Sequence, residues 1–460
     1  MMTYSDALNY LSSLTNFESR LETLDAGDFS LDVFRQFLAV LGNPQKSLTV
    51  AHIAGSKGKG STALLTAGML AAGGYCVGLY TSPHLYDVRE RVRVVSGSLR
   101  SQDAREEALF AGCVSPQEFA GLCAELGRVV EKDFAGRVTY FEFLTALALV
   151  HFQRVGVDVA VLETGLGGRL DATNVVESVV CGLTLVEREH VKILGGSLQA
   201  VAREKAGIVK PGCRRVVSAP QQPEVAEVFE QVCRRAGVPL WTVGRDIVVQ
   251  PDSREAGLFC VAAPQRCYRF TPRVPGAAWQ DNTAVAAGLV EALRGPGFES
   301  RLEAVQTAGS RLVWPARLEV LSEDPVVVVD GAHTPESCRM MVQTLTQRFG
   351  PRRWVLVFGT ATDKDAQGMA RVLADSVGRV VLTRFAHSRA ATDLIRRVGM
   401  IFSRAGAAVC EAPDAASALR QARDGLGCDQ MLVAAGSLYL AAEVRREFLR
   451  TTGADDGSIL

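Results

Sequence analysis

Residues 48–61, LTVAHIAGSKGKGS, decide how the first part of the chain folds. The opening residues, 48–54, are mostly apolar and predict a buried strand. Three glycines follow within six residues, and 61–70 has the apolar content of a helix that packs back on a sheet. A strand, a glycine turn and a helix N-terminus form an anion site, because glycines let backbone N–H groups approach a phosphate and the helix dipole favours negative charge.

Two side chains in this turn suit a nucleotide. Lys59 would bring a positive charge to the outer phosphates, and Ser61 would offer its hydroxyl to Mg2+. The pattern Gly-x-x-Gly-Lys-Gly-Ser is shorter than a Walker A motif, which has a glycine where this chain has Ile53. Taken alone, the loop could also be a glycine turn in an ordinary strand-helix unit, with Lys59 solvated.

The size and composition indicate a globular protein of two or three domains. The chain has 460 residues, of which 48% are hydrophobic and 22% charged, and both values are ordinary for a folded protein. Lys and Arg together number 50, as do Asp and Glu. The charge therefore gives no support for nucleic acid or an anionic membrane as a main partner.

The lack of a recognisable targeting signal and the scattered cysteines predict a cytoplasmic protein. The N-terminus, MMTYSDALNYL, lacks the basic start and apolar core of a signal peptide, and no run of about 18 apolar residues predicts a membrane span. The eleven cysteines form no CxxC pair, so we expect reduced thiols. Six histidines without ligand spacing argue against a structural zinc site.

Strands and helices alternate along the first two thirds of the chain. Helices are predicted over residues 4–14, 29–41, 115–133, 139–154, 198–208, 223–236, 280–294 and 302–307, and strands over 76–80, 158–163, 178–186 and 215–219, with short strands within 240–270. This alternation predicts an α/β fold with a mostly parallel, doubly wound sheet.

The pattern restarts around residues 308–315. A new buried strand, PVVVVD at 325–330, precedes a helix that begins at Pro335, and further strands are predicted over 354–358, 379–383, 407–411 and 430–434. We therefore expect two domains, 1–308 and 309–460, the second being an α/β domain of about 150 residues.

Polar residues follow several predicted strands, at the sheet edge where open α/β sheets bind ligands. Ser82, Glu163 and His190 each follow a strand and could meet next to Ser61. Because magnesium prefers oxygen, His190 is the least expected of these as a Mg2+ ligand. Spacing alone allows Glu163 to be a solvated carboxylate and His190 to be a core or capping histidine.

Three more candidates each have an ordinary structural alternative. Lys205, in EKAGIVK, could be a surface lysine paired with Glu204. Asp330 could cap the following helix or hydrogen-bond a ribose or base. Arg317 could bind a phosphate or pair with Glu319.

Taken together, these stretches resemble the folylpolyglutamate synthase/dihydrofolate synthase family of the Mur ligase superfamily. GLGGRLDATN and EKAGI, placed after a phosphate loop, are highly specific as a set. The matching stretches, in the family's order from about Phe29 to Arg446, are HIAGSKGKGS, TSPHLYDVRERVRV, TYFEFLTALAL, VLETGLGGRLDATNVV, REKAGIVK, ARLEVL, VVDGAHTPES, TATDKDA and VAAGSLYLAAEVR.

The resemblance implies a fold, a reaction and its partners. The fold would be an N-terminal P-loop mononucleotide-binding domain of Mur ligase type and a smaller C-terminal Rossmann-like α/β domain, with the active site in the cleft between them. The reaction would be ATP- and Mg2+-dependent, with one metal ion or two and K+ as a further candidate. It would join L-glutamate to a dihydropteroate or folate through an acyl phosphate. The expected partners are small molecules only, and the expected state is a monomer.

The resemblance also implies roles for individual residues. Those matching ATP-binding positions are Gly55, Gly58, Lys59, Gly60, Ser61, Asn282, Arg317 and Asp330. The metal ligands would be Ser61, Ser82, Glu163 and His190. The pterin side of the site would be formed by Thr139, Tyr140, Phe141, Gly167, Gly168, Arg169 and Asp171.

Lys59, Lys205 and His333 are the residues that the resemblance makes catalytic. Lys205 matches the family's carbamylated lysine, and the chemistry is sensible, because an ammonium repels Mg2+ whereas a carbamate is an anion that can bind it. His333 could face the phosphates or simply stand at the start of a helix.

The chain departs from the family's usual pattern at a few positions, none of which removes a group that the chemistry needs. Ser56-Lys57 stands in place of Thr-Asn, Glu189 in place of an Asp, Trp279 in place of a common His, and Thr334 in place of an Asn.

Two other readings remain open from the sequence. A Mur-type ligase for another acid acceptor, such as a peptidoglycan precursor, would lack TYFEF and GLGGRLDATN, which are present. A nucleotide-binding homologue that has lost ligation would have substitutions at Lys59, Glu163 or Lys205, and all three are intact. The sequence does not choose between dihydropteroate and tetrahydrofolate-polyglutamate as the acceptor.

Overall fold

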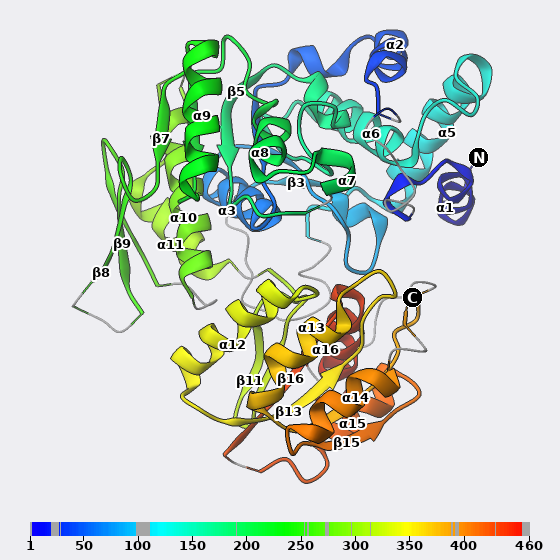
Figure 1. Ribbon diagram of the computed structural model, residues 1–460. Helices are drawn as coiled ribbons and strands as arrows, with labels where there is room; N and C mark the ends of the chain where they lie inside the picture. Colours follow the sequence, from blue (N-terminus) through cyan, green and yellow to red (C-terminus); the bar gives the residue numbers. More distant parts are fainter. Residues whose placement is uncertain are drawn as a thin grey trace. The chain divides into compact units, whose positions relative to one another are not determined.

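The computed structural model describes residues 2–19, 27, 29–97, 111–189, 191–252, 254, 257–271, 276–295, 297–312, 314–387, 390–391, 395–427 and 429–452. The chain divides into two compact units (Figure 1). Unit 1 comprises Met1–Leu99, Phe110–Pro272 and Ala278–Leu312, and unit 2 is built mainly from Val313–Leu460.

Unit 1 contains a seven-stranded sheet in the order β3-β2-β4-β1-β5-β6-β7. Neighbouring strands are parallel except β2 and β3, which are antiparallel. The predicted parallel, doubly wound sheet is therefore confirmed, with one additional antiparallel edge strand. The strands are β1 (Val50–Ala54), β2 (Val77–Tyr80), β3 (Val92–Val95), β4 (Val159–Glu163), β5 (Ser178–Leu183), β6 (Arg215–Ser218) and β7 (Leu240–Thr242).

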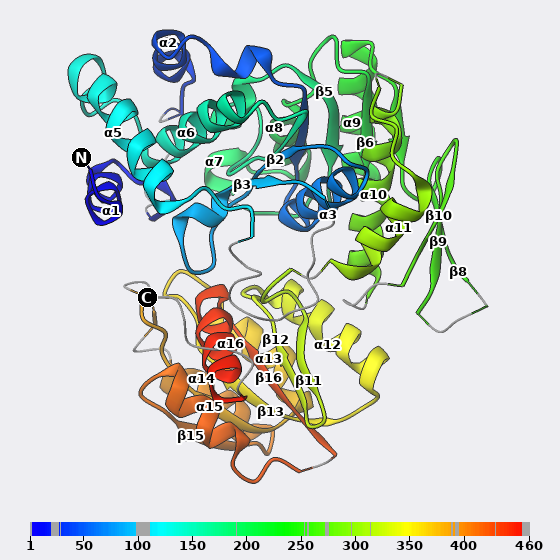
Figure 2. The same cartoon turned by 180° about the vertical axis from the view of Figure 1, so that it is seen from behind.

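Helices cover both faces of this sheet, as the two opposite views show (Figures 1 and 2). One face carries α6 (Tyr140–Val155), α8 (Leu198–Ala206) and α9 (Pro223–Ala236), which pack on the side of β1 that carries Val50 and Ala54. The other face carries α10 (Ala277–Leu293), whose Leu289 approaches Gly182 beside Ile53. Burial on both faces explains why the predicted strands are almost continuously apolar.

The described residues of unit 1 form further helices, of which α1 packs against α5 and α3 against α11. They are α1 (Tyr4–Ser13), α2 (Asp32–Val40), α3 (Lys59–Ala72), α5 (Pro116–Asp133), α7 (Val191–Leu194) and α11 (Leu302–Arg311). Within the residues that the structure describes, the 3-10 helices are Phe17–Ser19, Pro44–Ser47, Val88–Arg91, Ala172–Val175 and Ala374–Ser376.

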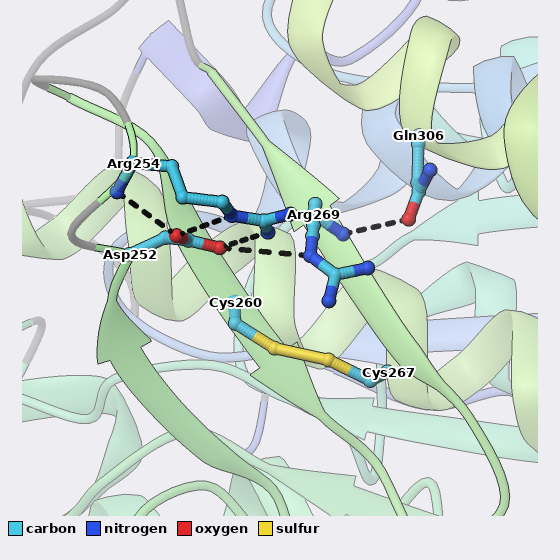
Figure 3. Close-up of a disulfide and its surroundings, with 6 residues drawn as sticks. All are labelled: Asp252, Arg254, Cys260, Cys267, Arg269 and Gln306. Atoms are coloured by element: carbon cyan, nitrogen blue, oxygen red, sulfur yellow. Dashed lines mark hydrogen bonds and ion pairs between the residues drawn. A yellow bond between two sulfur atoms is a disulfide. The ribbon is translucent and has the colours of Figure 1, made fainter.

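The short strands expected within 240–270 include a separate antiparallel sheet in the order β10-β9-β8. Its strands are β8 (Val248–Pro251), β9 (Phe259–Ala262) and β10 (Cys267–Phe270). A disulfide joins Cys260 of β9 to Cys267 of β10 (Figure 3). The expectation of reduced thiols is wrong for this pair, because the hairpin brings the two Cα atoms to 6.5 Å, inside the range that a disulfide spans.

Polar contacts near the disulfide stabilise this small sheet and connect it to α11 (Figure 3). Asp252 accepts a hydrogen bond from Arg254 Nε at 2.8 Å and forms an ion pair with Arg269 Nε at 3.5 Å. The backbone N–H of Arg269 donates to Gln306 Oε1 of α11 at 2.9 Å. Since α11 packs against α3, the small sheet is linked through α11 to the helix that follows the glycine turn.

Unit 2 contains a six-stranded sheet in the order β11-β12-β16-β13-β14-β15. The pairs are parallel except β11 with β12. The strands are β11 (Glu319–Glu323), β12 (Val326–Val329), β13 (Arg353–Phe358), β14 (Val377–Leu382), β15 (Ala408–Glu411) and β16 (Gln430–Ala435). The helices in the described residues of Val313–Leu460 are α12 (Pro335–Phe349), α13 (Ala366–Leu373), α14 (Ile395–Arg404), α15 (Ala415–Arg423) and α16 (Leu438–Thr452).

A search of the described ranges finds no helix with both the length and the apolar character needed to cross a bilayer.

Candidate active site

The glycine turn between β1 and α3 has the predicted strand-turn-helix form. Gly58 is the N-cap of α3 with φ +87°, a conformation that favours glycine, and a Cβ there would come within 2.2 Å of Asn282 Oδ1. The N–H groups of Ser56 and Lys57 both donate to the Leu185 carbonyl, at 2.8 and 3.1 Å. An anion would therefore meet the first-turn N–H groups of α3, which Gly58 cannot cap because it has no side chain.

Two lysines converge on the Gly55 carbonyl beside this turn. Lys59 Nζ donates to it at 3.0 Å and Lys205 Nζ at 2.8 Å. Lys205 is buried and also pairs with Glu189 Oε1 at 2.8 Å. Burial lowers the pKa of Lys205 to about 8, although the Glu189 carboxylate raises it, and the charge of Lys59 lowers it further. Glu189 had no predicted role, and its only signal in the sequence was that an Asp is usual there.

The ordinary alternative for Lys205 is wrong. The last turn of α8 directs Lys205 into the protein, where 1% of its side chain is exposed. Glu204, the residue before it, pairs instead with Arg169 Nε at 3.0 Å. Lys205 therefore lies at the glycine turn, where it meets Lys59 at the Gly55 carbonyl.

Glu163 and Ser82, two of the predicted metal ligands, lie next to each other. Glu163 ends β4 and is 4% exposed, so the alternative of a solvated carboxylate is wrong. Its Oε2 accepts the backbone N–H of Ser82 at 3.0 Å, and its register partner is Ile53 in β1, the strand that leads into the turn. Ser61 lies in the first turn of α3. His190 lies outside the described residues.

The donor set in this region fits Mg2+ better than a transition metal. In the part of the chain that the structure describes, no three His, Cys, Asp or Glu side chains group as a metal cage would require. Mg2+ commonly takes one or two carboxylates and completes its shell with phosphates and water. The buried carboxylate of Glu163, next to the backbone of Ser82, suits that pattern.

The GLGGRLD loop after β4 packs against the end of α8. A Cβ at Gly168 would lie 2.6 Å from the Lys205 carbonyl oxygen, so only glycine fits there. The backbone N–H of Arg169 donates to the Glu204 carbonyl at 2.8 Å, and Asn174 Nδ2 donates to the Arg169 and Gly207 carbonyls. These contacts fix the GLGGRLD loop against the C-terminal end of α8, where Lys205 lies.

A buried line of hydrogen bonds, absent from the sequence predictions, fixes Asp171 in this loop. One Asp171 oxygen accepts the Leu166 N–H at 2.8 Å, and the other accepts the Thr173 hydroxyl at 2.5 Å. The Thr173 hydroxyl is 2.8 Å from His52 Nε2, and since it donates to Asp171 it accepts from the histidine. Burial lowers the pKa of His52 to about 3, so the ring is neutral, and burial raises the pKa of Asp171.

The predicted pterin-side aromatic residues are divided between two environments. Phe141 lies against the glycine loop, where a Cβ at Gly165 would come within 2.5 Å of its ring. The Tyr140 ring faces the Arg91 guanidinium, 5.5 Å from its centroid. Thr139 is the N-cap of α6 and hydrogen-bonds Glu142 in a capping box. Gly167 has φ +69°, the left-handed region that favours glycine.

Unit 2 brings Arg317 and Asp330 together. Asp330 follows β12 and is 8% exposed, and its oxygens accept the N–H groups of Leu318 at 2.7 Å and Ala332 at 2.8 Å. Burial raises the pKa of Asp330, and the nearby Arg317 opposes this rise. The alternative of Asp330 as the helix cap is wrong, because Thr334 is the N-cap of α12.

His333 lies between Asp330 and α12. Its Nδ1 donates to the Gly331 carbonyl at 2.8 Å, because a carbonyl oxygen can only accept. Its backbone N–H donates to Ser337 Oγ at 3.1 Å. The Nδ1 hydrogen bond orients the imidazole ring toward the backbone of its own turn.

Comparison with known proteins identifies the family. Residues 316–438 match the model of the Mur ligase glutamate ligase domain. The chain is 30% identical over 420 residues to the dihydrofolate synthase/folylpolyglutamate synthase of Bacillus subtilis, covering 90% of this chain and 93% of the relative. The chain belongs to this family. It also resembles the crystal structure of Mycobacterium tuberculosis folylpolyglutamate synthase complexed with ADP and AMPPCP, with a TM-score of 0.81, 27% identity and coverage of 96% of this chain and 99% of that one.

Another member of the comparison is longer than this chain. The probable bifunctional folylpolyglutamate synthase/dihydropteroate synthase of Halobacterium salinarum is 35% identical over 464 residues, which cover 99% of this chain but 53% of that relative. The chain thus spans about half the length of the first relatives that it matches.

Proposed function

We propose that the protein is an ATP-dependent ligase that joins L-glutamate to a folate, to dihydropteroate, or to both. The observation that carries the proposal is the meeting of Lys59 and the buried Lys205 at the Gly55 carbonyl. This meeting of two lysines joins the glycine turn to α8, which carries the start of EKAGI. The contact of Gly168 with the Lys205 backbone then joins α8 to the GLGGRLD loop. Family membership supports the same reaction.

The reaction requires two steps that build negative charge on oxygen. The acceptor carboxylate attacks the γ-phosphate of ATP, which gives an acyl phosphate and ADP. The glutamate amine then attacks the acyl carbon, and inorganic phosphate leaves. Positive groups that are already in place stabilise such charge, and we assign this role to Lys59 and the first-turn N–H groups of α3. For the nucleotide itself we assign Asn282 in unit 1 and Arg317, Asp330 and His333 in unit 2.

We propose that Mg2+ is held by Glu163 with the hydroxyls of Ser61 and Ser82, and His190 joins them by resemblance. When bound, the ion would neutralise part of the phosphate charge. Glu163 is supported by its burial and by its bond to the Ser82 N–H, which fixes the carboxylate at the end of β4.

Carbamylation of Lys205 is also part of the proposal. A pKa of about 8 leaves roughly half of the amine neutral at pH 8, whereas an ordinary lysine would be under about 1% neutral. The neutral nitrogen attacks the carbon of CO2, a C–N bond forms, and one proton leaves to solvent. The nitrogen keeps one hydrogen for the Gly55 carbonyl, and the new carboxylate is an anion.

An ADP-release assay tests the function. We expect ADP only when ATP, Mg2+, L-glutamate and an acceptor are all present, with dihydropteroate and tetrahydrofolate supplied separately to identify the acceptor. Mass spectrometry of the product should show the addition of one glutamate. Equal ADP release with and without both acceptors would contradict the proposal and favour the other readings of the sequence. A cytoplasmic location and a monomeric state remain parts of the proposal.

A further inference from the structure

The residues immediately before and after Arg317 have a backbone conformation that residues with a Cβ seldom adopt. Ala316 has φ +57° and Leu318 has φ +46°. Among the described residues other than glycine, Asn43 alone shares a positive φ, and asparagine tolerates it better than leucine does. Such a turn persists only where the surrounding structure holds it, and strained turns concentrate at functional sites.

Two carboxylates hold this turn, one on each side of Arg317. Glu319 Oε2 accepts the Ala316 N–H at 2.8 Å, and Asp330 Oδ2 accepts the Leu318 N–H at 2.7 Å. The Ala316 carbonyl, in turn, accepts the Gly331 N–H at 2.8 Å. Both left-handed residues are therefore fixed by backbone hydrogen bonds to groups outside the turn.

Glu319 is fixed in turn by Arg445 of α16. Arg445 Nε lies 3.0 and 2.9 Å from the two Glu319 oxygens, and the side chains are 3% and 5% exposed. The predicted alternative, a surface pair between Arg317 and Glu319, is wrong because the Glu319 oxygens face Arg445 and the Ala316 N–H. A buried pair of this kind is sensitive to the loss of one partner, since the other charge is left uncompensated.

The Arg317 guanidinium has a defined place beside Gly331. A Cβ at Gly331 would come within 2.9 Å of Arg317 Nη1 and 2.8 Å of Leu438 Cδ1. The missing side chain at Gly331 thus leaves room for the guanidinium next to Asp330.

We infer that Arg445 is a positioning residue for nucleotide binding: through Glu319 it holds the Ala316–Leu318 turn and so directs Arg317 toward an anionic phosphate. Arg445 itself touches no substrate in this account. The inference rests on the proposed function, because it takes Arg317 as a contact of the nucleotide.

Nucleotide affinity, measured by calorimetry with AMPPCP and Mg2+, tests this inference. We expect Arg445→Met to raise the Kd by roughly tenfold or more, similar to Arg317→Ala, as the loss of one charge-assisted contact would. The double variant should bind no more weakly than Arg317→Ala alone, because Arg445 acts through Arg317. Arg450→Met is the matched control on the same helix, since Arg450 pairs with Glu447 and is 63% exposed, and it should leave the Kd unchanged.

A neutral pair covers the case in which Arg445→Met does not fold. In Glu319→Gln/Arg445→Met no buried charge is left unpaired, and the glutamine oxygen can still accept the Ala316 N–H. This variant should fold and recover most of the affinity.

Different results would overturn different claims. If the neutral pair folds but binds AMPPCP as weakly as Arg317→Ala, or if folded Arg445→Met binds like the wild type, the positioning role is refuted. Additive losses in the Arg317→Ala/Arg445→Met double variant would refute it as well. If Arg317→Ala itself binds like the wild type, the assignment of Arg317 to the nucleotide fails first.

Discussion

The shifted pKa of Lys205 should make the free energy of unfolding depend on pH. Its pKa is lowered to about 8 by burial, against about 10.5 in the unfolded chain. Between these values the unfolded state binds more protons, so the free energy of unfolding rises with pH. The penalty for burying the charge is present below pH 8 and fades toward pH 10.5, a change of up to about 3 kcal/mol.

Denaturation in CO2-free buffer measures this dependence. We expect the free energy of unfolding of the wild type, relative to Lys205→Met, to rise from pH 8 to pH 10.5. Methionine cannot titrate, so the variant supplies the baseline for all other groups. A constant difference across this pH range would show that Lys205 keeps an ordinary pKa.

A small carboxylate anion should partly restore the activity that is lost when Lys205 is replaced by alanine. If Lys205 is carbamylated, Lys205→Ala should be folded yet nearly inactive, and formate or acetate should restore part of its turnover by supplying the missing negative charge. Chloride at equal ionic strength is the control. Turnover like that of the wild type in the alanine variant would refute the carbamate.

The sequence predicted which residues matter near Lys205 but not their partners. Lys205, Lys59 and Gly55 were all named as site residues, because each belongs to a recognisable motif. That Lys205 bonds to Gly55, 150 positions away, depends on the packing of α8 against the sheet, which no local pattern encodes. His52 and Thr173 were missed for the same reason: they are 121 positions apart and meet only through strand order.

At the scale of elements, burial made several strands easy to recognise in the sequence. β1, β4 and β12 are buried along their length, so their apolar runs stand out in the sequence. β3 was missed, because Arg93 interrupts its short run of valines, and β11 was missed, because it is polar and only partly buried. The helix α3 begins two residues before the predicted start, since Lys59 and Gly60 are already helical and the left-handed turn residue is Gly58.

The link between β1 and the GLGGRLD loop can be tested at Thr173. Thr173→Val keeps the shape but loses the hydroxyl that joins Asp171 to His52, whereas Thr173→Ser keeps it. We expect the valine variant to raise the KM for the acceptor by roughly tenfold with little change in the KM for ATP, because Asp171 belongs to the proposed acceptor loop. The serine variant should stay close to the wild type.

The same substitution separates a binding role from a structural one. Thermal unfolding of both Thr173 variants shows how much of any loss is due to stability. Equal changes in the KM values for ATP and for the acceptor would contradict a specific role in the acceptor loop.

At the scale of the whole molecule, the residues proposed for the nucleotide are divided between the two units. Lys59 and Asn282 belong to unit 1, and Arg317 and Asp330 belong to unit 2. The division near residue 312 follows α11, which continues to Arg311 beyond its predicted end at 307. Sequence patterns indicated two α/β domains, because a strand-helix pattern that restarts is a local signal. They carry no comparable signal for whether one ligand contacts residues of both units.

Ligand-induced stabilisation tests whether both units act on one nucleotide. A ligand that binds only the folded state stabilises it by about 2.7 kcal/mol at a hundredfold excess over its Kd, so AMPPCP with Mg2+ should raise the Tm of the wild type. If one nucleotide contacts residues of both units, Lys59→Ala in unit 1 and Arg317→Ala in unit 2 should each lose most of this rise. Arg450→Met, on the exposed side of α16, should keep it. A full rise in Arg317→Ala together with its loss in Lys59→Ala would confine nucleotide binding to unit 1, and the assignment of Arg317 and Asp330 to the nucleotide would then have to be withdrawn.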